Sequence, residues 1–173
     1  MDHIVYLDNA ATTPVDPQVV QAMLPVLTGP GGNPSSHYSI GYEAKEQIDT
    51  ARAQVAAALG CLPGEVYFTG GGSEADNWAI KGTARKLARQ GKKHLITSAF
   101  EHHAVVHAMQ ALEKDGFEVT WLPVTADGFV RPEDVAAAIR PDTALVSVML
   151  ANNEIGTIQP IQEIAAICRE KKV

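Results

Sequence analysis

The sequence predicts an α/β fold in which a mostly parallel sheet is flanked by helices. Two observations support this prediction. From residue 44 onward, segments with helical spacing alternate with short strand-like runs, an order typical of parallel sheets. The run Thr143–Leu150 is almost continuously apolar, as in strands covered on both faces.

The predicted helices combine apolar residues at helical spacing with good helix formers. Two are followed directly by a glycine in the position of a C-cap, Gly60 and Gly91. The helical segments are Val19–Leu27, Ala44–Leu59, Ala75–Gln90, Ala104–Lys114, Pro132–Ile139 and Pro160–Lys172.

The predicted strands are Val66–Thr69, His94–Ser98, Glu118–Leu122 and Thr143–Leu150. Val173 follows the last helix and resembles the start of a further strand. We therefore expect the architecture to be incomplete at that point.

Residues 1–40 differ from the rest because they hold five prolines and a glycine-rich stretch. We interpret 1–40 as an extended arm and 41–173 as part of one domain.

Composition excludes several classes of function. The chain has 173 residues, 14 basic and 20 acidic, so its formal net charge of −6 disfavours binding to nucleic acid or an anionic membrane. No apolar run approaches the roughly 20 residues of a membrane helix. The N-terminus lacks the basic region of a secretory signal. Cys61 and Cys168 form no pattern, which favours the cytosol, and both are interpreted as small buried apolar residues.

Three polar clusters follow predicted strands: Gly70–Glu74, Glu101–His103 and Asn152–Glu154. Ligands of open α/β sheets bind outside the carboxyl ends of the strands, so we expect the clusters to converge on one crevice. The glycines and the following helix suit a phosphate group, with Ser73 adding a hydroxyl. The pattern is neither a P-loop nor a dinucleotide fingerprint. The alternative is a flexible turn in which Ser73 caps the helix.

The histidines and asparagines of these clusters admit several interpretations. His102 can stack on a ring, bind a metal or transfer a proton, or be an ordinary surface residue. His103 and His107 share a helix face, but no third ligand stands at metal-site spacing, so we expect no metal centre. Asn153 can donate to a ring oxygen or a carboxylate, or bond its own backbone in a loop.

Taken in order, these motifs resemble the cysteine desulfurase family of the aminotransferase class V group. Each motif is modest alone, but six in the right order make the resemblance specific over essentially the whole chain. The matching stretches are Tyr6–Pro14, Gly32–Ser36 with His37 and Gly41, Phe68–Asn77, Ile96–Ser98, Glu101–His102 with Ala104 and Val105, and Asn152–Ile161. His103 stands at a position that is variable in the family.

The resemblance implies a pyridoxal 5′-phosphate (PLP) cofactor and roles for four residues. Gly72 and Ser73 bind its phosphate, His102 stacks on the pyridine ring and assists proton transfer, and Asn153 bonds the phenolic oxygen. Ser73 stands where the family usually has threonine. The implied fold is the large domain of an aspartate aminotransferase-like enzyme, of which 41–173 form the N-terminal part. The arm then shapes the entrance of the active site, across a homodimer interface.

The family's other groups find no match in this sequence. These are the aspartate that pairs with the pyridinium nitrogen, the Schiff-base lysine, the nucleophilic cysteine and the arginine that binds the substrate carboxylate. Lys81, Cys61 and Cys168 do not match their motifs. The chain alone is therefore expected to be inactive.

The implied function is the N-terminal portion of an enzyme that converts L-cysteine to L-alanine and an enzyme persulfide, for iron–sulfur cluster or thio-cofactor synthesis. A sulfur-acceptor or scaffold protein is its expected partner, and a second chain can supply the C-terminal half. Two alternatives stay open: a non-catalytic interaction or dimerisation module, and a selenocysteine lyase or other class V enzyme.

Overall fold

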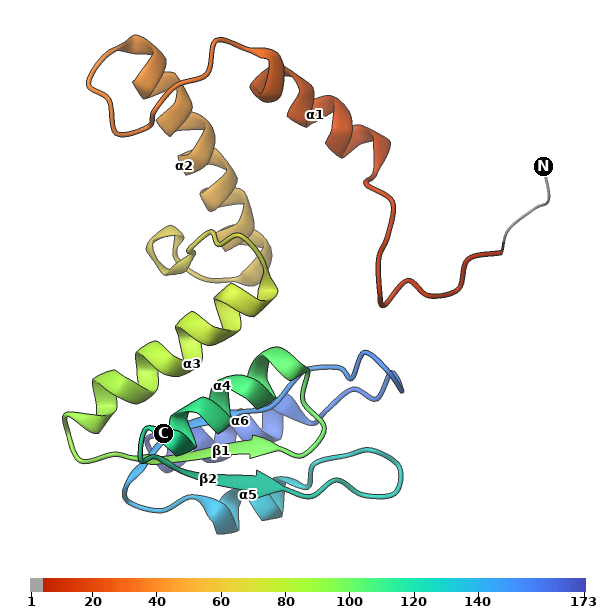
Figure 1. Cartoon of the computed structure of the whole chain (residues 1–173), viewed down its shortest axis with the longest axis vertical. Coiled ribbons are helices and arrows are strands. Elements are labelled where there is room, and N and C mark those ends of the chain that lie inside the picture. Colours follow the sequence, from red (N-terminus) through yellow and green to blue (C-terminus); the bar gives the residue numbers. More distant parts are fainter. Residues whose placement is uncertain (1–4) are drawn as a thin grey trace. The chain divides into compact units, whose positions relative to one another are not determined.

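A computed structural model describes residues 5–173, so residues 1–4 of the predicted arm lie outside the described residues. The chain divides into two compact units at Phe68/Thr69 (Figure 1). The predicted division into an arm, 1–40, and a domain, 41–173, stays a prediction.

Within residues 5–68, the first unit contains two helices and a short 3-10 turn. Helix α1 (Pro17–Thr28) begins at Asp16, whose Oδ1 accepts from the Gln18 amide at 2.7 Å. Helix α2 (Ser39–Leu59) ends at Gly60, which adopts φ 69°, a left-handed conformation that favours glycine. The turn η1 (Pro63–Glu65) follows α2.

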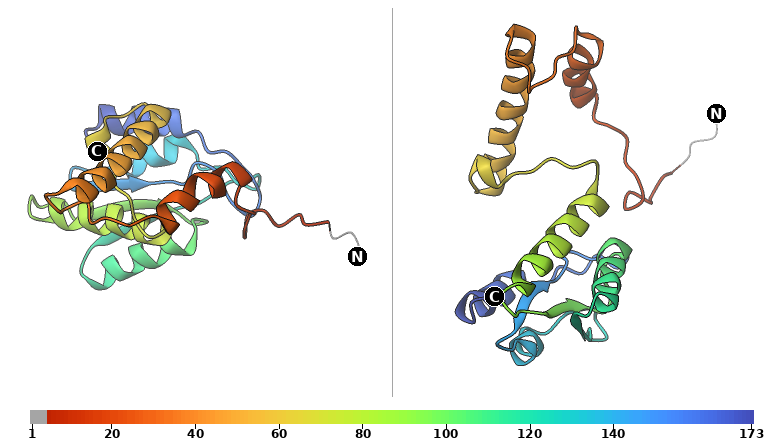
Figure 2. Two further views of the ribbon diagram at one scale, coloured as in Figure 1. Left: turned by 90° about the horizontal axis from the view of Figure 1, so that it is seen from above. Right: turned by 60° about the vertical axis from the view of Figure 1, so that its left-hand side comes forward.

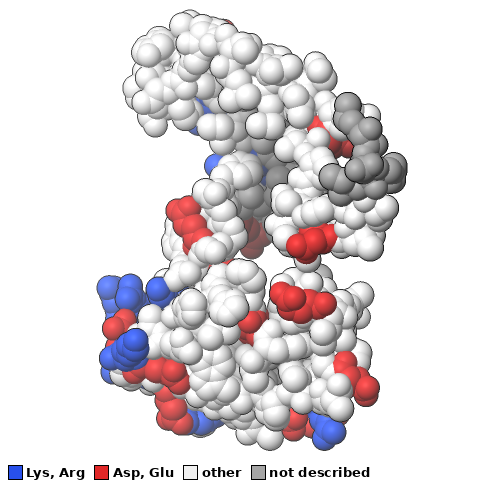
Figure 3. Space-filling model, turned by 45° about the vertical axis from the view of Figure 1, so that its right-hand side comes forward, with Lys and Arg blue, Asp and Glu red and all other residues white. Residues whose placement is uncertain are grey.

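Few side chains of this first unit are buried. Among its described apolar residues only Ala56 and Val66 belong to the core, whereas Leu27 on α1 is 71% exposed. Helix α1 has no charged residue, and the face of this unit seen in Figure 3 carries few. Exposed apolar side chains in such number are unusual for a monomer in water.

The second unit is an α/β sandwich built on a three-stranded sheet. Its strands are β1 (His94–Ser98), β2 (Glu118–Leu122) and β3 (Thr143–Ser147), in the order β2-β1-β3. Both strand pairs are parallel. The helices are α3 (Gly72–Ala88), α4 (His103–Lys114), α5 (Pro132–Ala138) and α6 (Ile161–Glu170). The predicted parallel sheet with flanking helices is confirmed.

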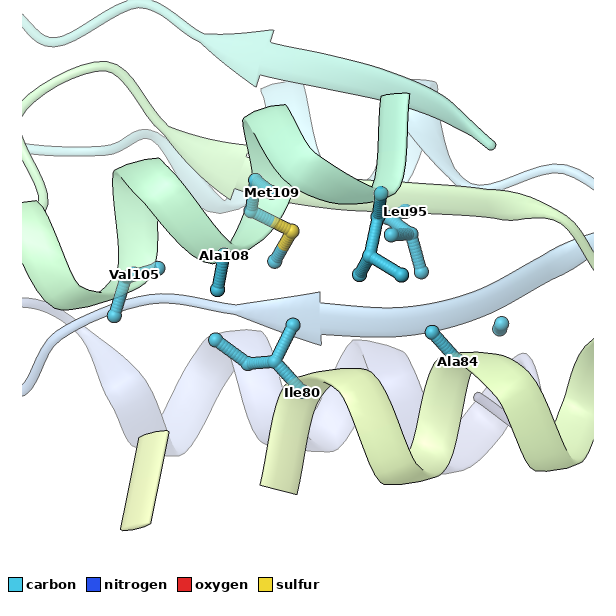
Figure 4. Packing of buried hydrophobic residues seen from close by; sticks show 8 residues of the cluster. Ile80, Ala84, Leu95, Val105, Ala108 and Met109 are labelled. Carbon is cyan, nitrogen blue, oxygen red and sulfur yellow. The ribbon is translucent and has the colours of Figure 1, made fainter. Parts of the chain in front are cut away.

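Two apolar clusters cover the two faces of this sheet. Leu95 of β1 packs with Ile80 of α3 and Met109 of α4 (Figure 4). Ile96, the next residue of β1, packs on the opposite face with Val135 of α5 and Ile164 of α6. Because successive strand side chains point to opposite faces, this alternation places two helices on each side, and Figure 2 gives two further views of this layering.

Two strand predictions need correction. Val66–Thr69 does not form a strand: the Val66 amide donates to the Pro63 carbonyl, and its carbonyl accepts from Arg52. These backbone groups are satisfied locally and have no ladder partner in the described residues. The last strand ends at Ser147 rather than Leu150, because the Met149 amide bonds a side chain instead of a neighbouring strand.

Among the described residues, no helix is long and apolar enough to cross a membrane.

Candidate cofactor-binding site

All three polar clusters lie in the second unit, at the edge where the parallel strands end. Helices α3 and α4 both begin at this edge (Figures 1 and 2). The second and third clusters are in direct contact, through a hydrogen bond of 3.1 Å from Asn152 Nδ2 to the Phe100 carbonyl. Burial is the main cause that raises the pKa of Glu101, and Asp76 of α3, two residues beyond the first cluster, adds a minor electrostatic contribution. The Asn152 contact joins the second and third clusters, and the convergence of all three clusters on one crevice stays a prediction.

The N-terminus of α3 offers donors without a side-chain cap. Gly71 stands at the N-cap position, and no side chain caps the amides there. The side chains of Thr69 and Asn77 bond only carbonyls of this turn, those of Gly71 and Ser73. A methyl group added at Gly71 or Gly72 would meet nothing within 4 Å, so the approach to the helix end is open. The hydroxyl of Ser73 has no hydrogen bond within the described residues. Free N–H groups, a positive dipole end and a hydroxyl form a donor set that fits a phosphate group.

Glu74 lies beside these donors but is already engaged. Its Oε2 accepts from the Gly70 amide at 2.7 Å. This bond orients the carboxylate toward the turn that precedes the helix, and it leaves the amides of the first helical turn for a ligand.

His102 is the N-cap of α4. Its Nδ1 accepts a hydrogen bond of 3.1 Å from the Ala104 amide. Because Nδ1 accepts, the single proton of the neutral ring lies on Nε2. His102 is exposed, and its ring makes a T-shaped contact with the ring of His103 at 6.2 Å between the centroids. Nε2 is the nitrogen that can hold or transfer a proton toward a ligand.

Glu101 is a feature of the site to which the sequence analysis gave no role. Its side chain is buried, at 9% exposure, and Oε1 accepts both from Ser98 Oγ at 2.7 Å and from the Met149 amide at 2.9 Å. Burial is the main cause that raises the pKa of this carboxyl above its ordinary value, while both hydrogen bonds oppose the shift. The sequence did hold a signal for this role, because Glu101 stands between a predicted buried strand and a histidine.

The two asparagines of the third cluster have different roles. Asn152 is buried, and its Oδ1 accepts from the amides of Glu154 and Ile155 at 2.9 and 3.0 Å. Asn152 therefore builds the loop. Asn153 is exposed, and its Nδ2 donates to Glu154 Oε1 at 2.8 Å. Beside this bond, Nδ2 of Asn153 has a second N–H that an incoming ligand can use, whereas the amide of Asn152 is buried and bonds the Phe100 carbonyl.

The remaining candidate residues do not form a site. The rings of His103 and His107 lie 5.5 Å apart, yet residues 5–173 contain no group of three potential metal ligands. Neither cysteine is fully buried, which corrects that interpretation. Cys168 packs against the second core cluster, where burial raises the pKa of its thiol, and Cys61 lies in the first unit.

The chain is similar to known proteins over nearly its full length. Cysteine desulfurase IscS of Methanosarcina thermophila is 56% identical over 169 residues, which are 98% of this chain and 42% of that protein. A solved NifS-like protein is 40% identical with a TM-score of 0.92, covering 96% of this chain and 46% of that one. A structure of SspA in complex with cysteine is 41% identical with a TM-score of 0.93, covering 97% and 48% respectively.

The chain spans less than half the length of each of these relatives. The aminotransferase class-V family matches residues 5–173. That match includes all three polar clusters and both units, and it confirms the family that the ordered motifs indicated. This chain belongs to the aminotransferase class-V family.

Proposed function

We propose that this chain is the N-terminal portion of a PLP-dependent cysteine desulfurase and forms one wall of its cofactor pocket. The observation that carries the proposal is the uncapped N-terminus of α3 at the same sheet edge as the exposed His102 and Asn153. A relative that is 56% identical to this chain is named a cysteine desulfurase, and this similarity supports the same reaction. No observation favours a selenocysteine lyase or a non-catalytic module.

The residues present fit the cofactor by their chemistry. The Gly72 amide and the Ser73 hydroxyl bind the phosphate, the ring of His102 stacks on the pyridine, and the amide of Asn153 donates to the phenolic oxygen. When bound, PLP supplies an electron sink for reactions at the amino acid's α-carbon. His102 holds its proton at Nε2 and can transfer it at that atom.

The covalent groups of the reaction come from outside these 173 residues. L-Cysteine and an enzyme thiol give L-alanine and an enzyme persulfide, which requires a nucleophilic cysteine. Cys168 is a poor thiolate because burial raises its pKa, and no lysine here matches the family's motif. We propose that the rest of the enzyme, in the same or a second chain, supplies the lysine and the cysteine, and that this chain alone is inactive.

The wider assignments follow from the same proposal. Residues 41–173 are the N-terminal part of the large domain, and residues 1–40 are an arm at the entrance of a homodimeric active site. The enzyme acts in the cytoplasm and passes sulfur to an acceptor or scaffold protein for iron–sulfur cluster or thio-cofactor synthesis.

Ligand binding to the 173-residue chain tests the pocket. Pyridoxine 5′-phosphate is the suitable probe because it lacks the aldehyde that reacts with surface lysines. We expect calorimetry to show binding of this probe at least about tenfold tighter than that of pyridoxine, since the phosphate adds charge-assisted hydrogen bonds. Equal or absent binding of the two compounds contradicts the proposal.

Turnover tests the missing groups separately. The chain is incubated with PLP and L-cysteine, and sulfide is compared with a blank that contains cofactor but no protein. We expect no sulfide above the blank. Catalytic turnover shows instead that a lysine and a nucleophile within residues 1–173 do the chemistry.

A further inference from the structure

One buried carboxyl joins the two loops that carry His102 and Asn153. Glu101 precedes His102 directly, and its Oε1 accepts from Ser98 at the end of β1 and from the Met149 amide beyond β3. The same oxygen therefore bonds the end of β1 and the loop after β3 at once, and thereby joins the loop of Glu101 to the loop of Asn153. It is held at 2.7 and 2.9 Å by donors that lie far apart in the sequence.

A second contact joins the same loops. Asn152 Nδ2 donates to the Phe100 carbonyl at 3.1 Å, while Asn152 Oδ1 bonds the two following loop amides. The exposed residues His102 and Asn153 are thus each next to a buried residue that crosses between the loops. Loops are the mobile parts of a fold, and a binding group must be held within about 0.5 Å to act well.

We propose that Glu101 is a positioning residue that fixes the ring of His102 relative to the amide of Asn153, and thereby shapes the seat of the cofactor's ring. This inference rests on the proposed function for the identity of the ligand. The fixed separation of the two side chains does not depend on it.

Three variants of the 173-residue chain test the positioning role. Glu101→Ala removes the carboxyl, Glu101→Gln keeps an oxygen that accepts from both donors, and Glu170→Ala removes an exposed carboxylate elsewhere as a matched control. Hydrogen exchange of the Met149 amide and NMR signals of the His102 ring and the Asn153 side-chain amide are measured without ligand. In Glu101→Ala we expect the Met149 amide to exchange about tenfold faster or more, and both side-chain signals to shift. The other two variants stay near wild type.

Ligand binding provides the second measurement. Glu101→Ala should weaken the binding of pyridoxine 5′-phosphate by about tenfold, because the groups that contact its ring are misplaced. The binding of inorganic phosphate should stay unchanged, because the variant leaves α3 intact. If wild type does not bind pyridoxine 5′-phosphate, the proposed function fails, and the ligand-free measurements alone decide the positioning role.

Unchanged Met149 exchange and unchanged side-chain signals in Glu101→Ala overturn the proposal. If that variant does not fold, Ser98→Ala replaces it, because it removes one of the two hydrogen bonds to Oε1. We then expect the same changes at smaller size, and a Ser98→Ala variant identical to wild type overturns the inference.

Discussion

At the scale of single residues, His102 shows how one side chain can serve the fold and the site together. Nδ1 accepts a hydrogen bond from the Ala104 amide and thus caps α4, while the residue itself stays exposed. The cap fixes the ring's direction and its tautomer. A residue in this position therefore contributes to stability even without a ligand.

Substitution of His102 separates its two contributions. His102→Ala should lower the free energy of unfolding by about 1 kcal/mol through loss of the N-cap. His102→Asn should restore most of this stability, because asparagine is a preferred N-cap, but it should not restore affinity for pyridoxine 5′-phosphate, since the aromatic ring is missing. Urea unfolding and calorimetry measure the two effects. An Asn variant as unstable as the Ala variant contradicts the capping role.

At the scale of elements, the start of the sheet is held by a buried histidine. His94 is fully buried in β1, and its two ring nitrogens lie 2.8 Å from the hydroxyls of Thr143 in β3 and Thr120 in β2. Burial, followed by the positive charge of Arg140, lowers the pKa of His94, and the nearby Asp142 and Glu118 oppose this only partly. The neutral ring therefore joins all three strands.

This arrangement predicts a dependence of stability on pH. The folded-state pKa lies below the ordinary 6.5, so the unfolded chain binds more protons as the pH falls below that value. The contribution of His94 is complete above about pH 6.5 and is lost progressively at lower pH. Urea unfolding between pH 7.5 and 5 should show this slope, and His94→Gln should flatten it.

A control at an exposed histidine gives this pH experiment its contrast. His107 is exposed on α4, and the His107→Gln variant should keep the wild-type dependence of stability on pH. If His94→Gln keeps the full slope as well, other groups cause it.

The N-terminus of α3 gives a prediction at the same scale. Ser73→Ala should weaken the binding of pyridoxine 5′-phosphate about tenfold, since a hydrogen bond to a charged group contributes about 1.5–3 kcal/mol. Ser73→Thr keeps the hydroxyl and should bind like wild type. Neither change should alter the binding of pyridoxine, which has no phosphate. Calorimetry with both compounds checks this, and a Thr variant as weak as the Ala variant argues against a hydroxyl contact.

Elements that carry their own signals could be predicted from the sequence, and those that depend on partners could not. The apolar run that starts at Thr143 predicted a strand near its observed position, and Gly60 predicted the observed end of a helix. Val66–Thr69 has the composition of a strand, but a strand also needs a neighbour for its backbone. Similarly, the contact of Glu101 with Met149 joins residues 48 apart, and no local pattern contains it.

At the scale of the whole molecule, the apolar cores are distributed unevenly. Both buried clusters belong to residues 69–173, whereas most of the large exposed apolar side chains lie within residues 5–68. Stability differs locally with the amount of buried apolar contact. The backbone amides of the two units should therefore differ strongly in their protection against hydrogen exchange.

Hydrogen exchange should reveal this difference directly. We expect amides of β1 and α4 to exchange only on global unfolding, and those of α1 and the first half of α2 to exchange at least about tenfold faster, because few apolar contacts hold them. The exposed apolar side chains should also make the chain associate as its concentration rises, which sedimentation measures. A single sharp unfolding transition of a monomer, with equal protection in both units, would contradict this expectation. It would require residues 5–68 to bury their apolar surface within one molecule, and α1 offers no buried residue by which to do so.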